Sequence, residues 1–152
     1  MKVIFLDIDG VLNSEESAKK GIHIDSNMVL RLKAIMEATG AKIVISSTWR
    51  IRTSIKTLEE LFWATGLGHH SRKIIDVTPQ PRRNDMYAGT DRGVIRGDEI
   101  AQWLKENPEV EKYIIIDDDS DFHDDQKEHF IQTTWKHGLL EEHVQEAIEL
   151  LK

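Results

Sequence analysis

Two aspartates separated by one residue follow a short apolar run near the start of the chain. They are Asp7 and Asp9, in the stretch "KVIFLDIDG". The apolar run at residues 2–6 is typical of a buried strand, so both carboxylates are expected at the end of that strand. Burying a carboxylate is costly unless a cation or hydrogen-bond donors compensate its charge. The pattern therefore indicates a partner of opposite charge at this point of the fold.

Two further apolar runs also end in polar clusters. The run "KIVISS" ends at Ser46 and Ser47, and the run "YIIID" leads into the acidic stretch "DDDSD". The acids of that stretch are Asp117, Asp118, Asp119 and Asp121. So many carboxylates cannot lie together as bare anions: either they face water or a hard cation neutralises some of them. A set of oxygen ligands suits Mg²⁺ better than zinc. With arginines nearby, these groups are the parts needed to hold a phosphoryl group.

Strands and helices alternate along the chain, with no repeat and no low-complexity segment. Strands are expected at residues 2–6, 41–46, 73–77, 113–117 and 129–134, and helices at 27–39, 54–65, 97–106 and 141–151. Ser26 and Ser54 are the expected N-caps, and Gly40 and Gly66 the expected helix ends. The alternation predicts an α/β fold, a three-layer Rossmann-like parallel sheet with helices on both faces. Because parallel strands share one carboxyl edge, where ligands bind, the polar clusters should meet there.

These stretches, in this order, resemble the motifs of the haloacid dehalogenase (HAD) superfamily of phosphotransferases. "FLDIDGVLN" is similar to its first motif, "KIVISS" to its second and "IIIDDDSD" to its fourth. The third motif, a basic residue near the start of the preceding helix, is matched best by Arg96 in "IRGDEI", with Arg92 as the alternative. More narrowly, "SSTWR", "RGDEIAQWL", "YIIIDDDSD" and "GLLEEHVQEAI" resemble the small HAD domains of Swiss-army-knife RNA repair proteins. The resemblance covers nearly the whole chain.

The resemblance implies a phosphatase that works through a covalent intermediate. Asp7 would attack phosphorus and form an aspartyl-phosphate, while Asp9 would protonate the leaving oxygen and then take a proton from water. Ser46 would donate a hydrogen bond to a phosphoryl oxygen, with Ser47 as the alternative. Arg96 would offset the negative charge between Asp7 and the phosphate.

The same resemblance implies a Mg²⁺ site. Its ligands would be the Asp7 carboxylate, the backbone carbonyl of Asp9, and Asp118. Asp117 and Asp121 would hold metal-bound waters rather than the metal itself.

Further residues are candidates for contact with the substrate. Gly10 begins a turn that can aim both leading carboxylates at one phosphate. Arg50 can bind a substrate phosphate or pair with the acidic cluster, and both interpretations stay open. The tryptophans are expected to pack in the core or at its edges rather than to stack on bases: Trp49, Trp63, Trp103 and Trp135.

The composition is that of an ordinary globular protein and excludes several classes. The 152 residues fit one domain, residues 1–152, and no apolar run approaches the length of a membrane span. With no cysteine there is no disulfide framework, and a cytoplasmic location is the expectation. The net charge of −7 argues against a broad nucleic-acid surface. Residues 71–97 differ, with six basic residues against three acidic ones, and we expect a basic, largely irregular segment bordering the site.

The short stretch between Gly10 and the first expected helix leaves no room for a large cap domain, so a nearly open site is predicted. Such a site admits a nucleotide, a small phosphomonoester or the phosphorylated end of a nucleic acid. The alternative is a non-catalytic phosphate- or nucleic-acid-binding module with the same fold. No membrane partner is expected, and the sequence makes no prediction of the oligomeric state.

Overall fold

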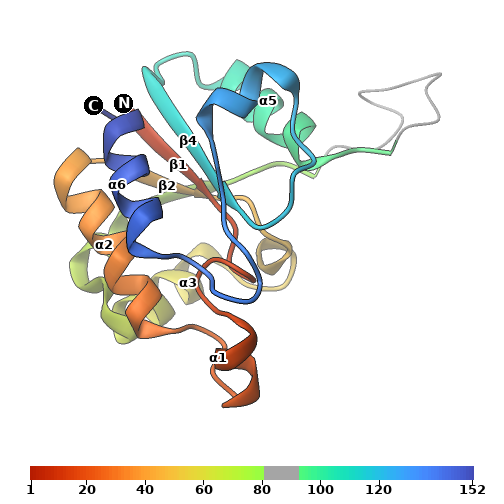
Figure 1. Cartoon of the computed structure of the whole chain (residues 1–152). Helices are drawn as coiled ribbons and strands as arrows, with labels where there is room; N and C mark the ends of the chain where they lie inside the picture. The colour runs from red at the N-terminus through yellow and green to blue at the C-terminus, as the bar shows by residue number, and fades with distance from the viewer. Residues whose placement is uncertain (81–92) are drawn as a thin grey trace.

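A computed structural model describes residues 1–80 and 93–152 as a parallel sheet with helices on both faces (Figure 1). The strands are β1 (Lys2–Leu6), β2 (Lys42–Ile45), β3 (Ile74–Val77), β4 (Lys112–Asp117) and β5 (Phe130–Gln132). They form a five-stranded sheet in the order β3-β2-β1-β4-β5, and every neighbouring pair is parallel. The predicted Rossmann-like α/β sheet is confirmed.

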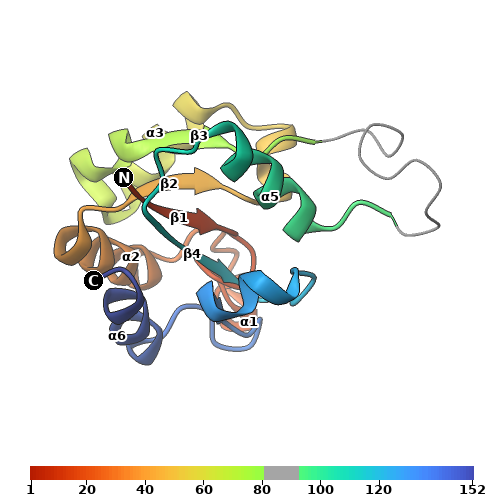
Figure 2. The same ribbon diagram turned by 90° about the horizontal axis from the view of Figure 1, so that it is seen from above.

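Helices of very different lengths connect the strands. The α-helices are α1 (Glu15–Lys19), α2 (Ser26–Thr39), α3 (Ile55–Phe62), α5 (Arg96–Glu106) and α6 (Glu141–Leu150). Shorter 3-10 turns form η1 (Thr48–Ile51), η3 (Gly68–Lys73) and η4 (Asp124–His129), and a π-helical turn forms η2 (Trp63–Leu67). Figure 2 shows α2 and α6 on one side of the sheet and α5 on the other.

The central strand supplies side chains to both hydrophobic cores. Ile4 and Leu6 are fully buried in the core formed with α2, α3 and α6. Val3 and Phe5 point to the opposite face, where they pack in a smaller core with Trp103 of α5. Because successive side chains of a strand alternate between faces, a strand covered on both sides must be apolar throughout. The continuous apolar run before Asp7 therefore reflects its central place in the sheet.

The chain reverses its direction of travel across the sheet at β1. From β1 it proceeds to β2 and β3 on one side, and then crosses back to β4 and β5 on the other. In open α/β sheets the crevice at such a switch point, beyond the carboxyl ends of the strands, is the usual ligand site. The residues that follow β1 and β4 are therefore the ones best placed to bind a ligand.

Most predicted element boundaries agree with the structure to within one or two residues. Ser26 is not the N-cap of α2: Asp25 holds that position, and its carboxylate accepts a hydrogen bond from the N–H of Asn27 at 3.0 Å. Helix α3 ends at Phe62, earlier than the pattern predicts, because the π-helical turn η2 follows it. Gly66 lies inside that turn with φ 126°, a conformation that favours glycine.

No cap domain is present among the described residues. Between β1 and α2 the chain forms only the short helix α1, which the sequence pattern did not predict. None of the helices in the described residues is both long and apolar enough to cross a membrane.

The basic segment is only partly irregular where the structure describes it. Its first residues belong to η3 and β3, and Arg96 begins α5. Arg72 packs over the ring of Trp63, with 5.3 Å between the guanidinium carbon and the ring centroid. Three further basic residues of this segment, Arg82, Arg83 and Arg92, lie outside the described residues.

Candidate active site

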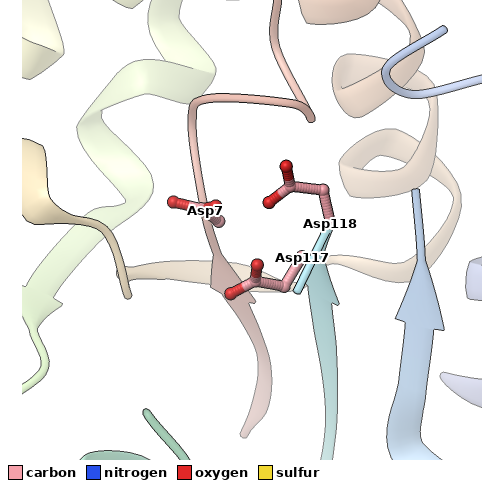
Figure 3. A group of neighbouring side chains, drawn as sticks. All are labelled: Asp7, Asp117 and Asp118. Atoms are coloured by element: carbon pink, nitrogen blue, oxygen red, sulfur yellow. The ribbon is translucent and has the colours of Figure 1, made fainter. Parts of the chain in front are cut away.

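Three carboxylates meet where β1 and β4 end. Asp7 directly follows β1, Asp117 is the last residue of β4, and Asp118 follows it. One oxygen of each lies within 4.8 Å of the other two, and the three side chains face a common space (Figure 3). Asp7 and Asp117 are buried and Asp118 is partly exposed. Such a group of oxygens within this distance is a potential metal site.

Burial makes this cluster electrostatically costly without a cation. It raises the pKa of Asp117 to about 8, with the neighbouring Asp7 carboxylate as the second cause. Burial also raises the pKa of Asp7, and the Arg96 guanidinium acts against that rise. A protein that keeps two such carboxyl groups together has a site that a positive charge would stabilise.

Arg96 supplies one positive charge next to the cluster. Its Nη1 lies 3.4 Å from Asp7 Oδ1 and 3.7 Å from Asp117 Oδ2, and it also donates to the backbone carbonyl of Ser46. The two carboxylates hold the pKa of Arg96 above its usual value, although burial acts in the opposite direction. As the first residue of α5, Arg96 is fixed by the helix that packs on the smaller core.

Gly10 makes room for Asp118. A Cβ built at Gly10 would lie 2.3 Å from Asp118 Oδ2, far inside a normal contact, and the φ of Gly10 is +80°. The turn is held from the other side by Thr133, whose hydroxyl donates to the Gly10 carbonyl at 2.6 Å. Thr133 also donates its N–H to the Asp117 carbonyl at 3.0 Å. The turn after β1 and the end of β4 are therefore tied together around the acidic cluster.

Asp9 points to a different set of partners. Its Oδ1 accepts a hydrogen bond from Asn13 Nδ2 at 2.8 Å, and its Oδ2 accepts one from Trp49 Nε1 at 3.1 Å. Asn13 is itself fixed, because its Oδ1 accepts from the N–H of Gly10 and its Nδ2 donates to the His23 carbonyl. The Asp9 carboxylate is thus held at the exposed rim of the site, outside the cluster.

Neither Asn13 nor this role of Trp49 was predicted. Asn13 closes the stretch "KVIFLDIDGVLN", and an amide that can both donate and accept, four residues after Asp9, was the available signal. Among the other tryptophans, Trp103 packs in the core as expected. Trp63 and Trp135 are 47% and 45% exposed, so these two lie outside the buried core, and their predicted packing at its edges stays a prediction.

The two serines after β2 have different surroundings. The Ser47 hydroxyl donates a hydrogen bond to Asp7, and its oxygen accepts the N–H of Trp49 at 3.3 Å. The Ser46 hydroxyl is buried and has no hydrogen-bond partner in the described part of the chain. Ser46 is therefore the hydroxyl with free hydrogen-bonding capacity next to Arg96, and Ser47 is a support for Asp7.

A comparison of the chain with protein-family models finds a match that covers most of its length. Residues 3–144 match the model described as the HAD domain in Swiss Army Knife RNA repair proteins. The chain belongs to this family. The comparisons with curated proteins and with solved structures found no match. Membership of this HAD family indicates a phosphohydrolase-type function, and HAD domains usually use Mg²⁺.

The residues that resemble HAD motifs in the sequence lie close together in the structure. Asp7 follows β1, Ser46 and Ser47 follow β2, and Asp117 and Asp118 lie at the end of β4, all at the carboxyl edge of the sheet. Arg96, the first residue of α5, contacts Asp7 and Asp117. The alternative third-motif residue, Arg92, lies outside the described residues.

Arg50 is occupied elsewhere and is not available to a substrate phosphate. Its side chain is 5% exposed and forms an ion pair with Glu99 of α5. Its Nε donates to the Thr78 carbonyl at 3.0 Å and its Nη1 to the Ser47 carbonyl at 2.7 Å. Of the two interpretations that the sequence leaves open, the structure favours an ion pair, but its partner is Glu99 and not the acidic cluster. Arg50 ties η1 and the end of β3 to the helix that carries Arg96.

Asp121 also has a structural contact that the sequence did not reveal. Its Oδ2 accepts the N–H of Arg96 at 3.1 Å, and its carbonyl accepts the N–H of Gly97 at 3.0 Å. Asp121 thus caps the start of α5 and does not belong to the group Asp7, Asp117 and Asp118. Its Oδ1 is buried and has no hydrogen-bond partner in the described residues, so its predicted contact with a metal-bound water stays a prediction.

The acidic cluster of this HAD domain has the donor set that Mg²⁺ requires. All available ligand atoms are oxygens, and they come from two neighbouring strand ends. Asp117 Oδ2 is buried without a hydrogen-bond partner in the described residues, and its other oxygen accepts the N–H of Asp119 at 2.9 Å. A buried carboxylate oxygen that receives no hydrogen bond, with Arg96 Nη1 no nearer than 3.7 Å, fits a site in which a hydrated cation supplies that hydrogen bond.

Proposed function

We propose that this protein is a Mg²⁺-dependent phosphomonoester hydrolase that works through an aspartyl-phosphate on Asp7. The observation that carries the proposal is the meeting of Asp7, Asp117, Asp118 and Arg96 at the switch point of the sheet. One nucleophilic carboxylate, two further acids and one cation, fixed on neighbouring elements, form a site for a dianionic phosphoryl group.

In the first step an oxygen of the Asp7 carboxylate forms a bond to phosphorus, and the bond between phosphorus and the ester oxygen breaks. Asp9 donates its proton to that oxygen, so the leaving group departs as an alcohol. In the second step water attacks phosphorus, and the bond to Asp7 breaks. The Asp9 carboxylate takes a proton from this water, which restores both side chains and releases inorganic phosphate.

The protein contributes electrostatic positioning in both steps. Arg96 lies next to the attacking carboxylate and offsets the repulsion between it and a phosphate, and Ser46 provides a hydroxyl for a phosphoryl oxygen. Asn13 and Trp49 keep Asp9 directed to the rim of the site, so that it can exchange protons with the leaving group and with water.

Mg²⁺ would be held by Asp7 and Asp118, with the Asp9 carbonyl as a further ligand and Asp117 as a partner of its bound water. Its chemistry in the site is to neutralise phosphate and carboxylate charge that would otherwise repel. Arg50 acts on this site through α5. Asp121 holds the start of α5 with one carboxylate oxygen, and its other oxygen, Oδ1, would be a further partner of metal-bound water.

The substrate of the proposed reaction is a nucleotide, a small phosphomonoester or the phosphorylated end of a nucleic acid. The absence of a cap among the described residues supports an open site that does not enclose a small molecule. The family description supports a nucleic-acid end, since it names RNA repair proteins.

The proposal is tested by turnover of an aryl phosphate with Mg²⁺ and after its removal by a chelator. Asp7→Asn and Asp9→Asn should each lower kcat by roughly a thousandfold or more, because each removes a group that enters the reaction. Asp119→Asn is the matched control, since Asp119 lies in the same acidic stretch but is exposed and outside the cluster. Undiminished activity in the Asp7→Asn protein would overturn the mechanism.

The competing function is a binding module with this fold and no activity. The unpaired Ser46 hydroxyl and the charge of Arg96 would serve phosphate binding equally well. Binding of phosphate by the wild-type protein without turnover of any phosphomonoester would favour this function over the hydrolase.

A further inference from the structure

A hollow of about 500 Å³ opens beside Asp9 on the η1 side of the site. Its walls are formed by six residues: Asp9, Thr48, Trp49, Ile51, Arg52 and Thr53. Apart from Asp9, all belong to η1 or directly follow it, and backbone hydrogen bonds from Arg52 and Thr53 to the Trp49 carbonyl keep this turn compact. The hollow therefore lies between one short, compact turn and Asp9 at the rim of the candidate active site.

The Asp9 carboxylate connects the hollow with the proposed reaction. That carboxylate lies outside the cluster of Asp7, Asp117 and Asp118 and is one wall of the hollow. If Asp9 protonates the leaving oxygen, as the proposed function requires, that oxygen must lie within hydrogen-bonding distance of it. The rest of the leaving group then extends from this oxygen towards the hollow. The assignment of the hollow therefore rests on the proposed function.

The walls combine an apolar surface with an available cation. Trp49 is partly buried against the main core and also lines the hollow, and Ile51 is 57% exposed. A solvent-exposed isoleucine beside a tryptophan forms a surface that a planar ring can cover. Arg52 is exposed, and no ion pair involves it in the described residues. The neighbouring Arg50, in contrast, is fully occupied by Glu99 and by backbone carbonyls.

We propose that this hollow is the leaving-group subsite, and that it selects a leaving group with a planar ring and a second anionic group. The ring covers Trp49 and Ile51, and the anionic group pairs with Arg52. A nucleoside that carries a second phosphate has this chemistry, whether it is a free nucleoside bisphosphate or the terminal nucleotide of a strand.

Trp49 has a second part in this subsite, as a positioning residue for Asp9. Its indole N–H donates to Asp9 Oδ2 at 3.1 Å, while its ring lines the hollow. One side chain therefore connects the place where the leaving group lies with the group that protonates it. The two parts are separable, because phenylalanine keeps a ring and has no N–H.

The selectivity is tested with four Mg²⁺-dependent assays on the wild-type protein. The substrates are glycerol phosphate, which has no ring, p-nitrophenyl phosphate, which has a ring and no second charge, a nucleoside 3′,5′-bisphosphate, and an oligonucleotide with a 3′-phosphate. We expect kcat/KM to rise by roughly tenfold or more from glycerol phosphate to the bisphosphate. Comparison of the bisphosphate with the oligonucleotide distinguishes a free nucleotide from a strand end, since the preferred substrate has the higher kcat/KM. Equal values for glycerol phosphate and both nucleotide substrates would overturn the subsite.

Two variants test the walls directly. Arg52→Ser should lower the ratio of kcat/KM between the bisphosphate and p-nitrophenyl phosphate by about tenfold, and Ile51→Ser should raise KM for both ring-bearing substrates. Both side chains are exposed, so the fold should tolerate the changes. Lys42→Ser is the control, because Lys42 is an exposed cation at the opposite end of β2 and should leave every value unchanged. An unchanged ratio in Arg52→Ser would contradict the pairing.

The positioning role of Trp49 has its own readout. Trp49→Phe should lower kcat for the bisphosphate, whose alcohol leaves poorly without a proton, much more than for p-nitrophenyl phosphate, whose phenol leaves easily. KM should stay nearly constant in Trp49→Phe and rise in Trp49→Leu, which also lacks the ring. Trp63→Phe, at an exposed tryptophan on η2, is the control. An equal loss of kcat on both substrates would indicate a merely structural role.

Failure of this inference is distinguishable from failure of the proposed function. If no phosphomonoester is hydrolysed, the proposed hydrolase function is wrong, and the proposed leaving-group subsite is wrong as well. If p-nitrophenyl phosphate is hydrolysed through Asp7 but the substrates and variants show no selectivity, the hydrolase stands and the subsite alone is wrong.

Discussion

Gly10 and Asp118 come from different strand ends, yet the geometry of each depends on the other. The Asp118 carboxylate lies where a Cβ of residue 10 would be, and the backbone of Gly10 has a φ that favours glycine. A turn residue of the first motif thus decides whether an acid of the fourth motif can join Asp7. The sequence predicts that Gly10 begins a turn that aims the leading carboxylates, and the structure adds that Gly10 provides space for the Asp118 carboxylate, a proposed metal ligand.

Gly10→Ala should displace Asp118 and weaken Mg²⁺ binding by about tenfold or more, as changes next to metal ligands do. The measurement is the rise of Tm with increasing Mg²⁺, which follows the affinity for the folded state. Gly21→Ala is a matched control. Gly21 has φ +70°, close to that of Gly10, but no atom within 4 Å of its missing Cβ. A Mg²⁺ response of Gly10→Ala equal to that of the wild type would contradict the account.

At the scale of elements, the positions of the strands along the chain and the residues at their ends followed from the sequence, but the strand order within the sheet and many side-chain partners did not. Apolar runs that end in acids identified the ends of β1 and β4, because a buried parallel strand is visible in a single sequence as a continuous apolar run. The partners of Asp9, Arg50 and Asp121 were not visible in this way. Those contacts join residues that are distant along the chain, through loops whose course the local pattern does not determine.

Helix α5 is the element on which the site depends most. It begins with Arg96, is capped by Asp121, and is tied to the turn after β2 by the ion pair between Arg50 and Glu99. Both side chains of that pair are largely buried, at 5% and 13% exposure. Removing one partner leaves the other charge buried and unpaired, which costs far more than a surface ion pair gives.

Glu99→Gln should therefore lower the free energy of unfolding by about 3 kcal/mol, measured by urea denaturation. Glu106→Gln is the control on the same helix, because Glu106 is exposed and its loss should stay within about 0.5 kcal/mol. The double variant Arg50→Met/Glu99→Leu should recover part of the loss, since no buried charge remains unpaired. A loss in Glu99→Gln no larger than that in Glu106→Gln would show that the pair does not hold α5.

At the scale of the whole molecule, the net charge of −7 is partly concentrated in a buried cluster. A carboxyl group whose pKa rises on folding binds its proton more tightly in the folded chain than in the unfolded one. For Asp117 the pH range in which the folded chain binds this extra proton extends from the ordinary pKa of 3.8 to a pKa of about 8. Within it, each increase in pH removes stability from the metal-free protein. Mg²⁺ competes with these protons, so its stabilising effect should grow over the same range.

The metal-free wild-type protein should therefore lose several degrees of Tm between pH 5 and pH 8 through this cluster. Asp117→Asn should reduce this slope, since asparagine does not titrate. The slope is measured by thermal unfolding in the presence of a chelator, and saturating Mg²⁺ should restore the wild-type Tm at pH 8. A wild-type slope that Asp117→Asn leaves unaltered would show that the cluster does not control the pH dependence.

The central claim is that Asp7 carries the phosphoryl group. The most direct measurement is the mass of the acid-quenched protein during turnover of an aryl phosphate with Mg²⁺, followed by digestion to locate the added group. We predict one phosphoryl group on Asp7 in the wild type, a larger labelled fraction in Asp9→Asn if hydrolysis of the aspartyl-phosphate slows more than its formation, and none in Asp7→Asn. Turnover without any label on Asp7, or a label on another residue, would contradict the account.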